Sequence, residues 1–534
     1  MHYRALSAAA VAACLAASLQ PPSARAADDA AAIIAKHAAY VGHPDGVVLT
    51  YHLGASGAAS KDAVAEIRTT YRRGALYRTV YQHDGVSEQD GFTGRAFWSS
   101  DENGYTVLDL EDSGRMMYTE NLVEAGVPAD VPATVRPSST VDGVAVDVVR
   151  IAPAAGVAAD IAFDRATGAY VRVTYDPDHR FFSRSGVQRY GKYVDVAPGV
   201  RVPGTVGTGD GTLTLAEHAV RAVGNDDLRG PVPTASWDYA TSDASPIEII
   251  DHPTPYAFVP RGQAVHVQAT VNGKTGTFLL DSGAADIIVY RPFADSLNLT
   301  TLGQTSFSGV NGVTIGARYA RAATIKVGGN TLSNVVLTVA PHIVQVDRSN
   351  LQPEVDGILG YGFLAGALVD VDLTGKTIRI LNPSTMQPTV KPGAYAFPVN
   401  LASRQPEIAL KINNVATRAY FDSGDDFLAV LSDDLKSSGR VVALTDTLNA
   451  GGGQTTDYAI TFTGVDGVSQ VPARCSRLQE ISVGPYRYQN VETCFGPADV
   501  YGKNGGLIGF DFLRHFNWTF DYVESKLVLT PNGK

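Results

Sequence analysis

The chain has 534 residues, of which 45% are hydrophobic and 18% are charged, and this globular balance excludes wholesale disorder. The formal net charge is −11, from 43 basic and 54 acidic residues, so no basic surface dominates and nucleic acid is not expected as a partner. The length corresponds to roughly three domains. The abundance of Gly and Tyr, together with Val and Thr, favours β-structure with many tight turns.

Residues 1–26 have the pattern of an export signal. A small, apolar stretch at 5–19 follows Arg4, and residues 24–26 form an A-x-A cleavage site. We therefore expect a periplasmic or secreted protein. Residues 11–14 also resemble a lipobox, which would instead make Cys14 a lipidated N-terminus at the outer membrane. No later segment approaches 18 consecutive apolar residues, so no transmembrane segment is expected in the mature protein.

The region after the signal, 27–225, has the pattern of an antiparallel β-domain. A short amphipathic helix is predicted at 28–40. Short alternating runs separated by turn residues then predict strands at 47–52, 65–70, 76–82, 96–99, 144–151, 161–163 and 170–175. Periodicity fades and prolines accumulate at 226–255, which predicts a linker or an extended crossing segment.

An internal repeat follows the predicted linker. Residues 267–281 align without gaps on 408–422, and each segment continues with Ser-Gly. Further on, 325–341 align on 481–497, and 357–364 align on 506–513. The chain therefore contains two copies of one β-rich unit, at 256–388 and 389–534.

Two cysteines remain once the signal is removed. Cys475 and Cys494 flank two apolar runs, 478–483 and 486–491, which are separated by Gly-Pro and predict a β-hairpin. In an oxidising compartment an even pair favours a disulfide. Two buried thiols are the alternative.

The residues that carry chemistry are the two Asp-Ser-Gly tripeptides. Asp281 and Asp422 each follow an apolar strand, at equivalent points of the two copies. A pseudo-twofold arrangement would bring their carboxylates face to face, and two carboxylates in contact share one proton. Such a pair contains both a base and an acid, and it can activate water for attack on an amide without a metal or a covalent intermediate. Because zinc-ligand spacings are missing, neither a metal nor another cofactor is expected.

The repeated half resembles the aspartic peptidases, specifically bacterial retropepsin-like proteins with two tandem copies in one chain. Residues 279–286 (LLDSGAAD) resemble the active-site stretch of that family, and 358–360 and 507–509 resemble its second hallmark, two apolar residues followed by Gly. Glycines stand where such proteins carry a flap: Gly309 and Gly312 in the first copy, Gly451 and Gly452 in the second.

This resemblance implies two acid-protease-like β-barrel lobes that form a pseudo-twofold bilobal unit. It implies that Asp281 and Asp422 are the catalytic dyad of an endopeptidase and that a peptide or protein substrate lies beneath the flaps. The hydroxyls of Ser282 and Ser423, together with the adjacent Gly283 and Gly424, would support the dyad.

The sequence departs from the family pattern beside the second aspartate. Both copies have Ser where Thr is commoner, and the second copy continues with Asp425 and Asp426 where a small residue is expected. The extra acids could raise the pKa of Asp422, favour basic substrates, or indicate that the loop has drifted. A non-catalytic exported ligand- or lipoprotein-binding protein with a pseudo-protease region is therefore the alternative function.

The N-terminal region resembles, less specifically, the LolA-like exported lipoprotein-binding folds. The opening helix, the strand meander, and the segments at 91–98 and 163–168 carry this resemblance. It implies a curved antiparallel sheet with an apolar concave face and a lipid or lipoprotein as a partner. The alternative is a folded spacer whose apolar residues form only a core.

Overall fold

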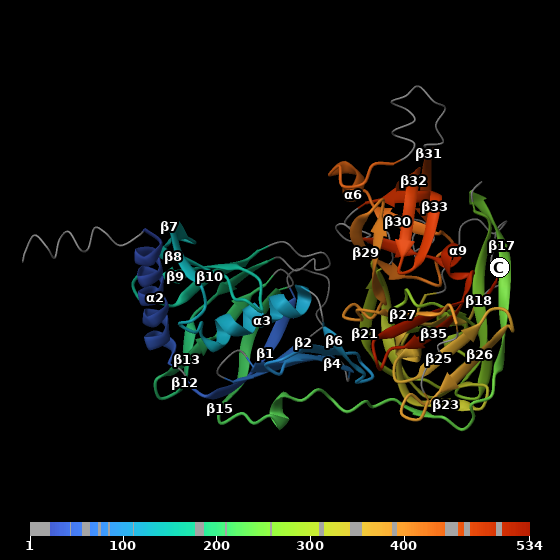
Figure 1. The fold of residues 1–534 in the computed structure, drawn as a ribbon. Coiled ribbons are helices and arrows are strands. Elements are labelled where there is room, and N and C mark those ends of the chain that lie inside the picture. The colour runs from blue at the N-terminus through green and yellow to red at the C-terminus, as the bar shows by residue number, and fades with distance from the viewer. Residues whose placement is uncertain are drawn as a thin grey trace, which may run out of the picture. The chain divides into compact units, whose positions relative to one another are not determined.

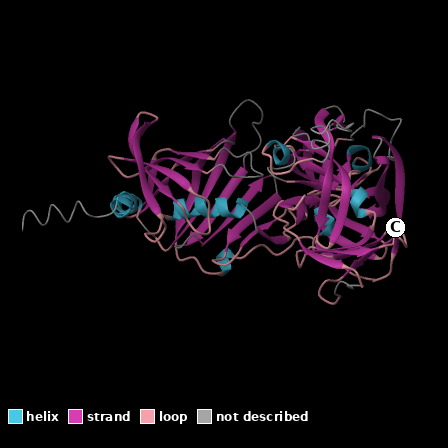
Figure 2. Ribbon diagram, turned by 45° about the horizontal axis from the view of Figure 1, so that its top comes forward, coloured by secondary structure: helices cyan, strands magenta, loops and turns pink. Residues whose placement is uncertain are grey.

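The protein is mainly β-structure, as the sequence predicts, with two longer helices near the N-terminus and several helices of a single turn (Figures 1 and 2). Internal contacts divide the chain into two units, the first made of Met1–Tyr81, Gly91–Phe97 and Asp112–Arg229, and the second of Gln82–Asp90, Trp98–Glu111 and Gly230–Lys534. The computed structural model describes residues 22–533 except 43, 56–64, 73–75, 84–85, 110–111, 177–185, 209–210, 257–258, 309–313, 342–354, 387–391, 444–457, 464–469 and 498–504.

The N-terminal region contains one long antiparallel sheet. Its strand order is β6-β5-β4-β3-β2-β1-β15-β14-β11-β10-β9-β8-β7, so nearly all neighbours in the sheet are neighbours in the chain. The small hairpin β12-β13 lies outside this sheet. The elements are α2 (Pro22–Val41), β1 (Gly46–Ala55), β2 (Ala65–Arg72), β3 (Leu76–His83), β4 (Val86–Phe92), β5 (Phe97–Ser100), β6 (Thr106–Asp109), α3 (Asp112–Ala125), β7 (Ala133–Val141), β8 (Val144–Ile151), β9 (Ala159–Asp164), β10 (Tyr170–Tyr175), β11 (Val187–Tyr190), β12 (Tyr193–Ala197), β13 (Val200–Pro203), β14 (Thr205–Gly207) and β15 (Gly211–Val220).

Two helices of this region differ from the sequence prediction. The helix predicted at 28–40 begins earlier, at Pro22, because an Ala-rich stretch favours helix and Pro is tolerated in a first turn. Residues 1–21 of the predicted signal lie outside the described residues. Helix α3 was not predicted, since its sequence DSGRMMYTENLVEA shows no clear apolar stripe. It nevertheless buries Met116, Leu122 and Val123 in the core of the first unit.

The proline-rich segment 226–255, predicted as a linker, contains a 3₁₀ turn, η1 (Asp226–Leu228), and two strands, β16 (Ser236–Asp238) and β17 (Ser245–Tyr256). Strand β16 pairs with β23 (Asn330–Ala340), and β17 pairs along most of its length with β18 (Val259–Val271). Much of the segment predicted as a linker or extended crossing segment is therefore extended and paired in a sheet. Within the described chain, β17 pairs with β26 (Thr377–Leu381) at Ser245 and Pro246.

The second unit contains the two sequence copies. The first copy adds to β17, β18, β23 and β26 the elements β19 (Lys274–Leu280), β20 (Ile287–Tyr290), α4 (Arg291–Ala294), β21 (Thr300–Ser308), β22 (Thr314–Val327), β24 (Gly357–Leu359), α5 (Tyr361–Leu364) and β25 (Leu368–Asp372). The second copy contains β27 (Tyr395–Pro398), β28 (Glu407–Ile412), β29 (Val415–Phe421), β30 (Ala429–Ser432), α6 (Asp434–Ser437), β31 (Tyr458–Thr463), β32 (Gln470–Val483), β33 (Tyr486–Gly496), β34 (Gly506–Ile508), α9 (Phe510–Leu513), β35 (Phe516–Asp521) and β36 (Lys526–Pro531).

The two copies have the same strand topology. In the first, β24 pairs in parallel with β19 and antiparallel with β20, and β20 pairs in parallel with β23. In the second, β34, β29, β30 and β33 make the same three pairings. The repeat detected in the sequence is thus also a repeat of fold.

A shared sheet joins the two copies into one bilobal body. Strand β25 of the first copy pairs antiparallel with β35 of the second, for example at Val369 and Phe520 (Figure 1). Both of these side chains are buried, and one continuous core cluster includes residues from both copies. Neither copy therefore has a separate core.

The disulfide predicted from the cysteine spacing is present. Cys475 on β32 and Cys494 on β33 are directly opposed in the antiparallel hairpin and are bonded to each other.

The disulfide closes a loop with a sequence separation of 19 residues. We expect Cys475→Ser with Cys494→Ser to lower the free energy of unfolding by about 3 kcal/mol, because the bridge restricts the unfolded chain. Urea unfolding of the double variant measures this loss. A non-reduced tryptic digest of the wild type should contain the linked peptides, and two alkylatable thiols in the native protein would refute the bridge.

Candidate active site

The two Asp-Ser-Gly loops occupy equivalent positions in the two copies. Asp281 directly follows β19, and Asp422 directly follows β29. The backbone N–H of Asp281 donates to the carbonyl of Leu359 (3.1 Å), and that of Asp422 donates to the carbonyl of Ile508 (2.9 Å). The apolar-apolar-Gly segments of the sequence thus lie beside the loops and hold the start of each one.

The two loops are bonded to each other through their serines. The Ser282 hydroxyl donates to the carbonyl of Phe421 (2.7 Å), and the Ser423 hydroxyl donates to the carbonyl of Leu280 (2.9 Å). Each hydroxyl oxygen also accepts the backbone N–H of the opposite serine, at 3.0 and 3.1 Å. Both serines are completely buried. This reciprocal set of four bonds fixes the separation of the loops.

The glycine after each serine allows the opposite aspartate to approach. A Cβ placed on Gly283 would lie 2.4 Å from Cγ of Asp422, and one on Gly424 would lie 2.6 Å from Cγ of Asp281. Any larger residue would collide with a carboxyl group. The Gly283 N–H also donates to Oδ1 of Asp281 (2.8 Å), and the Gly424 N–H donates to Oδ1 of Asp422 (2.9 Å).

The two carboxyl groups perturb each other. Burial raises the pKa of Asp281 above its usual range, although backbone N–H groups and a hydrogen bond with Asp422 oppose the change. Burial, followed by the charge of Asp281 and then that of Asp425, holds the pKa of Asp422 well above its usual range. Both pKa values are thus raised, as expected when two adjacent carboxyls share one proton.

The first of the two additional acids in the second loop, Asp425, also has a perturbed pKa. Asp425 occupies the position that Ala284 has in the first copy. Its carbonyl accepts the N–H of Phe510, which attaches this loop to α9 (2.6 Å). Burial, followed by the charge of Asp426, raises the pKa of Asp425 to about 8.

A partly buried ion cluster next to the first loop was not found from the sequence. Arg404 lies 2.9 Å from Glu102, 3.2 Å from Glu88 and 3.6 Å from Asp286, the last five residues after Asp281. The Glu102 side chain is 2% exposed. The next residue, Gln405, donates from its side-chain amide to the carbonyl of Gly283. These residues are up to about three hundred positions apart, so no local motif could have revealed the cluster.

Some predicted site residues cannot be placed. The flap candidates Gly309, Gly312, Gly451 and Gly452 lie outside the described residues, although β21 and β22 flank the first pair.

Within the described part of the chain, no group of three or more His, Cys, Asp or Glu side chains is arranged to hold a metal ion. No described helix has the length and apolarity needed to cross a membrane.

Residues 267–363 match the family model described as aspartyl protease. The matched segment contains Asp281 and the 358–360 hallmark, and it ends before the second copy begins. Among solved structures, a domain from Vibrio parahaemolyticus described as an outer membrane lipoprotein-sorting protein matches 38% of this chain and 97% of its own length, at 11% identity and a TM-score of 0.29. No curated protein sequence matches the chain.

Proposed function

We propose that the chain is an exported aspartic endopeptidase in which Asp281 and Asp422 form the catalytic dyad. The observation that carries this proposal is the reciprocal bonding of the two loops, which leaves two carboxyl groups in contact on a rigid base. The family match to the first copy supports the reaction class. The bonded loops hold a proton donor and a proton acceptor in fixed geometry, as general acid–base catalysis requires.

The reaction follows from the shared proton. The ionised carboxyl takes a proton from a water molecule held between the two groups, and the water oxygen attacks the carbonyl carbon of the peptide bond. The protonated carboxyl gives its proton to the carbonyl oxygen, which produces a tetrahedral diol. One hydroxyl of the diol then returns its proton to the ionised carboxyl. The other carboxyl, which took its proton from water, protonates the amide nitrogen, and the C–N bond breaks. The products are a carboxylic acid and an amine, and the dyad recovers its single proton.

Export and partners form part of the same proposal. The signal at 1–26 supports a periplasmic or secreted protein, and Cys14 leaves a lipoprotein at the outer membrane as the alternative. The disulfide fits an oxidising compartment. The substrate would be a peptide or protein, and a lipid or lipoprotein is the partner expected for the N-terminal region.

Cleavage of denatured casein by the full-length mature protein, between pH 3 and 8 and with or without pepstatin, tests the proposed activity. Cleavage that pepstatin blocks supports an aspartic mechanism. Cleavage that pepstatin does not affect, or no cleavage of any substrate, would favour the non-catalytic binding protein.

We expect a bell-shaped dependence of kcat/KM on pH. Activity falls on the acidic side when both carboxyls are protonated, and on the alkaline side when the pair loses its shared proton. Since the pKa of Asp422 is raised partly by the charge of Asp425, Asp425→Ala should lower that pKa and move the alkaline limb to lower pH. The acidic limb should move less. An unchanged alkaline limb would show that Asp425 does not act on the dyad.

A further inference from the structure

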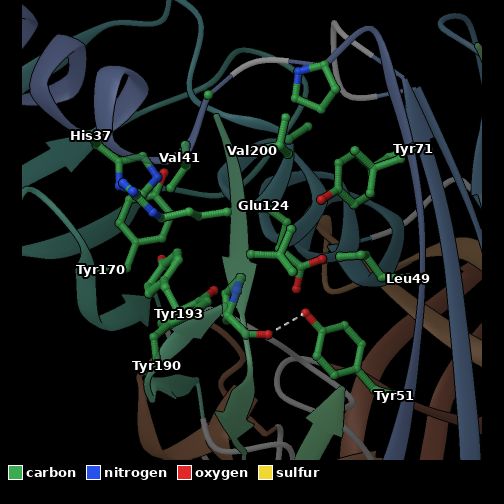
Figure 3. A pocket seen from close by; sticks show the side chains of 17 residues that line it. His37, Val41, Leu49, Tyr51, Tyr71, Glu124, Tyr170, Tyr190, Tyr193 and Val200 are labelled. Atoms are coloured by element: carbon green, nitrogen blue, oxygen red, sulfur yellow. Dashed lines mark hydrogen bonds between the residues drawn. The ribbon is translucent and has the colours of Figure 1, made fainter. Parts of the chain in front are cut away.

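The first unit contains a cavity that the proposed peptidase activity does not use. Its empty space, counted together with the solvent at its mouth, is about 540 Å³. An adjoining cavity, with about 890 Å³ of empty space counted in the same way, shares two lining residues with it, Tyr51 and Glu124. Glu124 lies near the last turn of α3, and Figure 3 shows its carboxyl group in the middle of the lining side chains.

The wall around this carboxyl is aromatic. The lining includes Tyr51, Tyr71, Tyr170, Tyr190, Tyr193 and His37. Several of the phenol groups already donate elsewhere: Tyr51 to the carbonyl of Pro203 (3.1 Å), Tyr170 to that of Val123 (3.0 Å), and Tyr190 to the side chain of Gln188 (2.8 Å). These three hydroxyls therefore do not donate to Glu124, and the rings that carry them form an apolar wall that a ligand can contact.

Glu124 has no hydrogen bond or ion pair among the residues that the structure describes. Burial, followed by the charge of Glu120 one helical turn earlier, raises the pKa of Glu124 to about 8. Both glutamates line the second cavity. A carboxyl group in such a place is costly to ionise unless a positive charge comes to it.

The cationic side chains near the cavity are already engaged. Arg201 lines the cavity, but its guanidinium lies 2.9 Å from Asp195 and also donates to the carbonyl of Tyr40. Nδ1 of His37 lies 2.8 Å from the carbonyl of Gly168. A positively charged ligand would therefore be attracted to this part of the cavity, whereas Glu120 and Glu124 would repel a ligand carboxylate.

We propose that this cavity binds a small organic cation, with its ammonium group at Glu124 and its apolar body against the tyrosines. An ammonium group gains both from a buried carboxylate and from aromatic faces. The same chemistry could come from a free amine or from the lysine side chain of a peptide. The proposal concerns only the first unit and does not depend on peptidase activity.

Isothermal titration calorimetry of the full-length mature protein tests the proposal, with butylamine, tetramethylammonium, an acetylated and amidated Gly-Lys-Gly peptide, and decanoate as probes. We expect the amines to bind and decanoate not to bind. Tighter binding of butylamine than of the peptide would indicate a free amine, and the reverse would indicate a lysine side chain. Affinity for the cations should rise between pH 6 and 9, because Glu124 must release a proton.

Glu124→Gln should weaken cation binding by at least about tenfold and remove its dependence on pH, since the charge-assisted contact is lost. Glu217→Gln, on the exposed face of β15, is the matched control and should bind as the wild type does. If Glu124→Gln does not fold, the pH dependence of wild-type binding decides. The proposal is overturned if no cation binds, if Glu124→Gln binds cations normally, or if decanoate binds in preference to the amines.

Discussion

Asp281→Asn and Asp422→Asn should each lower kcat by at least about a hundredfold, and together they should be no worse than either alone. General acid–base catalysis contributes about 10²–10⁴-fold, and the dyad needs both of its carboxyls to share one proton. Asparagine keeps the shape of the side chain and can still accept the N–H of Gly283 or Gly424, so the fold should remain. Casein cleavage and circular dichroism of each variant measure the two effects.

Asp433→Asn is the matched control, because Asp433 is an exposed aspartate of the second copy and lies outside the loops. It should leave kcat unchanged. Substantial activity in Asp422→Asn would contradict the proposed dyad. In that case the second copy would be structural, and the active species would need two first copies, which gel filtration of the variant can detect.

Arg404→Met should lower the free energy of unfolding by about 3–5 kcal/mol, because it leaves buried carboxyls without their cation. Burial, together with the charge of Asp286, raises the pKa of Glu102 well above its usual range, and burial raises that of Asp101 to about 7. These carboxyls accept protons as the pH falls, so the destabilisation should shrink between pH 7 and pH 5. Activity should fall as well, since Arg404 precedes the residue that bonds Gly283.

Urea unfolding at the two pH values measures the effect of Arg404→Met. Arg487→Met is the control: Arg487 pairs with Glu480 in the same unit, but its side chain is 67% exposed. Exposed pairs contribute about 0–1 kcal/mol, so this variant should stay close to the wild type at both pH values. An equal loss in the two variants, or a loss in Arg404→Met that does not vary with pH, would show that the cluster has no special role.

The geometry of the loops could be predicted largely from the sequence. Two Asp-Ser-Gly tripeptides at equivalent points of a repeat imply a pseudo-twofold arrangement, and the small residues beside Asp281 and Asp422 leave space for two loops to touch. The Cys475–Cys494 pair could be predicted for a similar reason, since both cysteines lie on one hairpin. In each case the partners belong to local patterns whose register is set by a few neighbouring residues.

The β-rich class, the duplication, the two Asp-Ser-Gly positions and the cysteine pair are visible in the sequence, because hydrophobic periodicity and repeated motifs are local properties. The distant residues that surround each site are visible only in the folded chain. Glu88 and Glu102 belong by their contacts to the unit that contains Arg404, although they lie in the N-terminal half of the chain. Likewise, α3 brings Glu124 among tyrosines from several strands. Such clusters form by packing between residues that are distant in the chain, so the neighbouring sequence gives no sign of them. Burial in the cluster then changes the pKa of a carboxyl according to the groups around it.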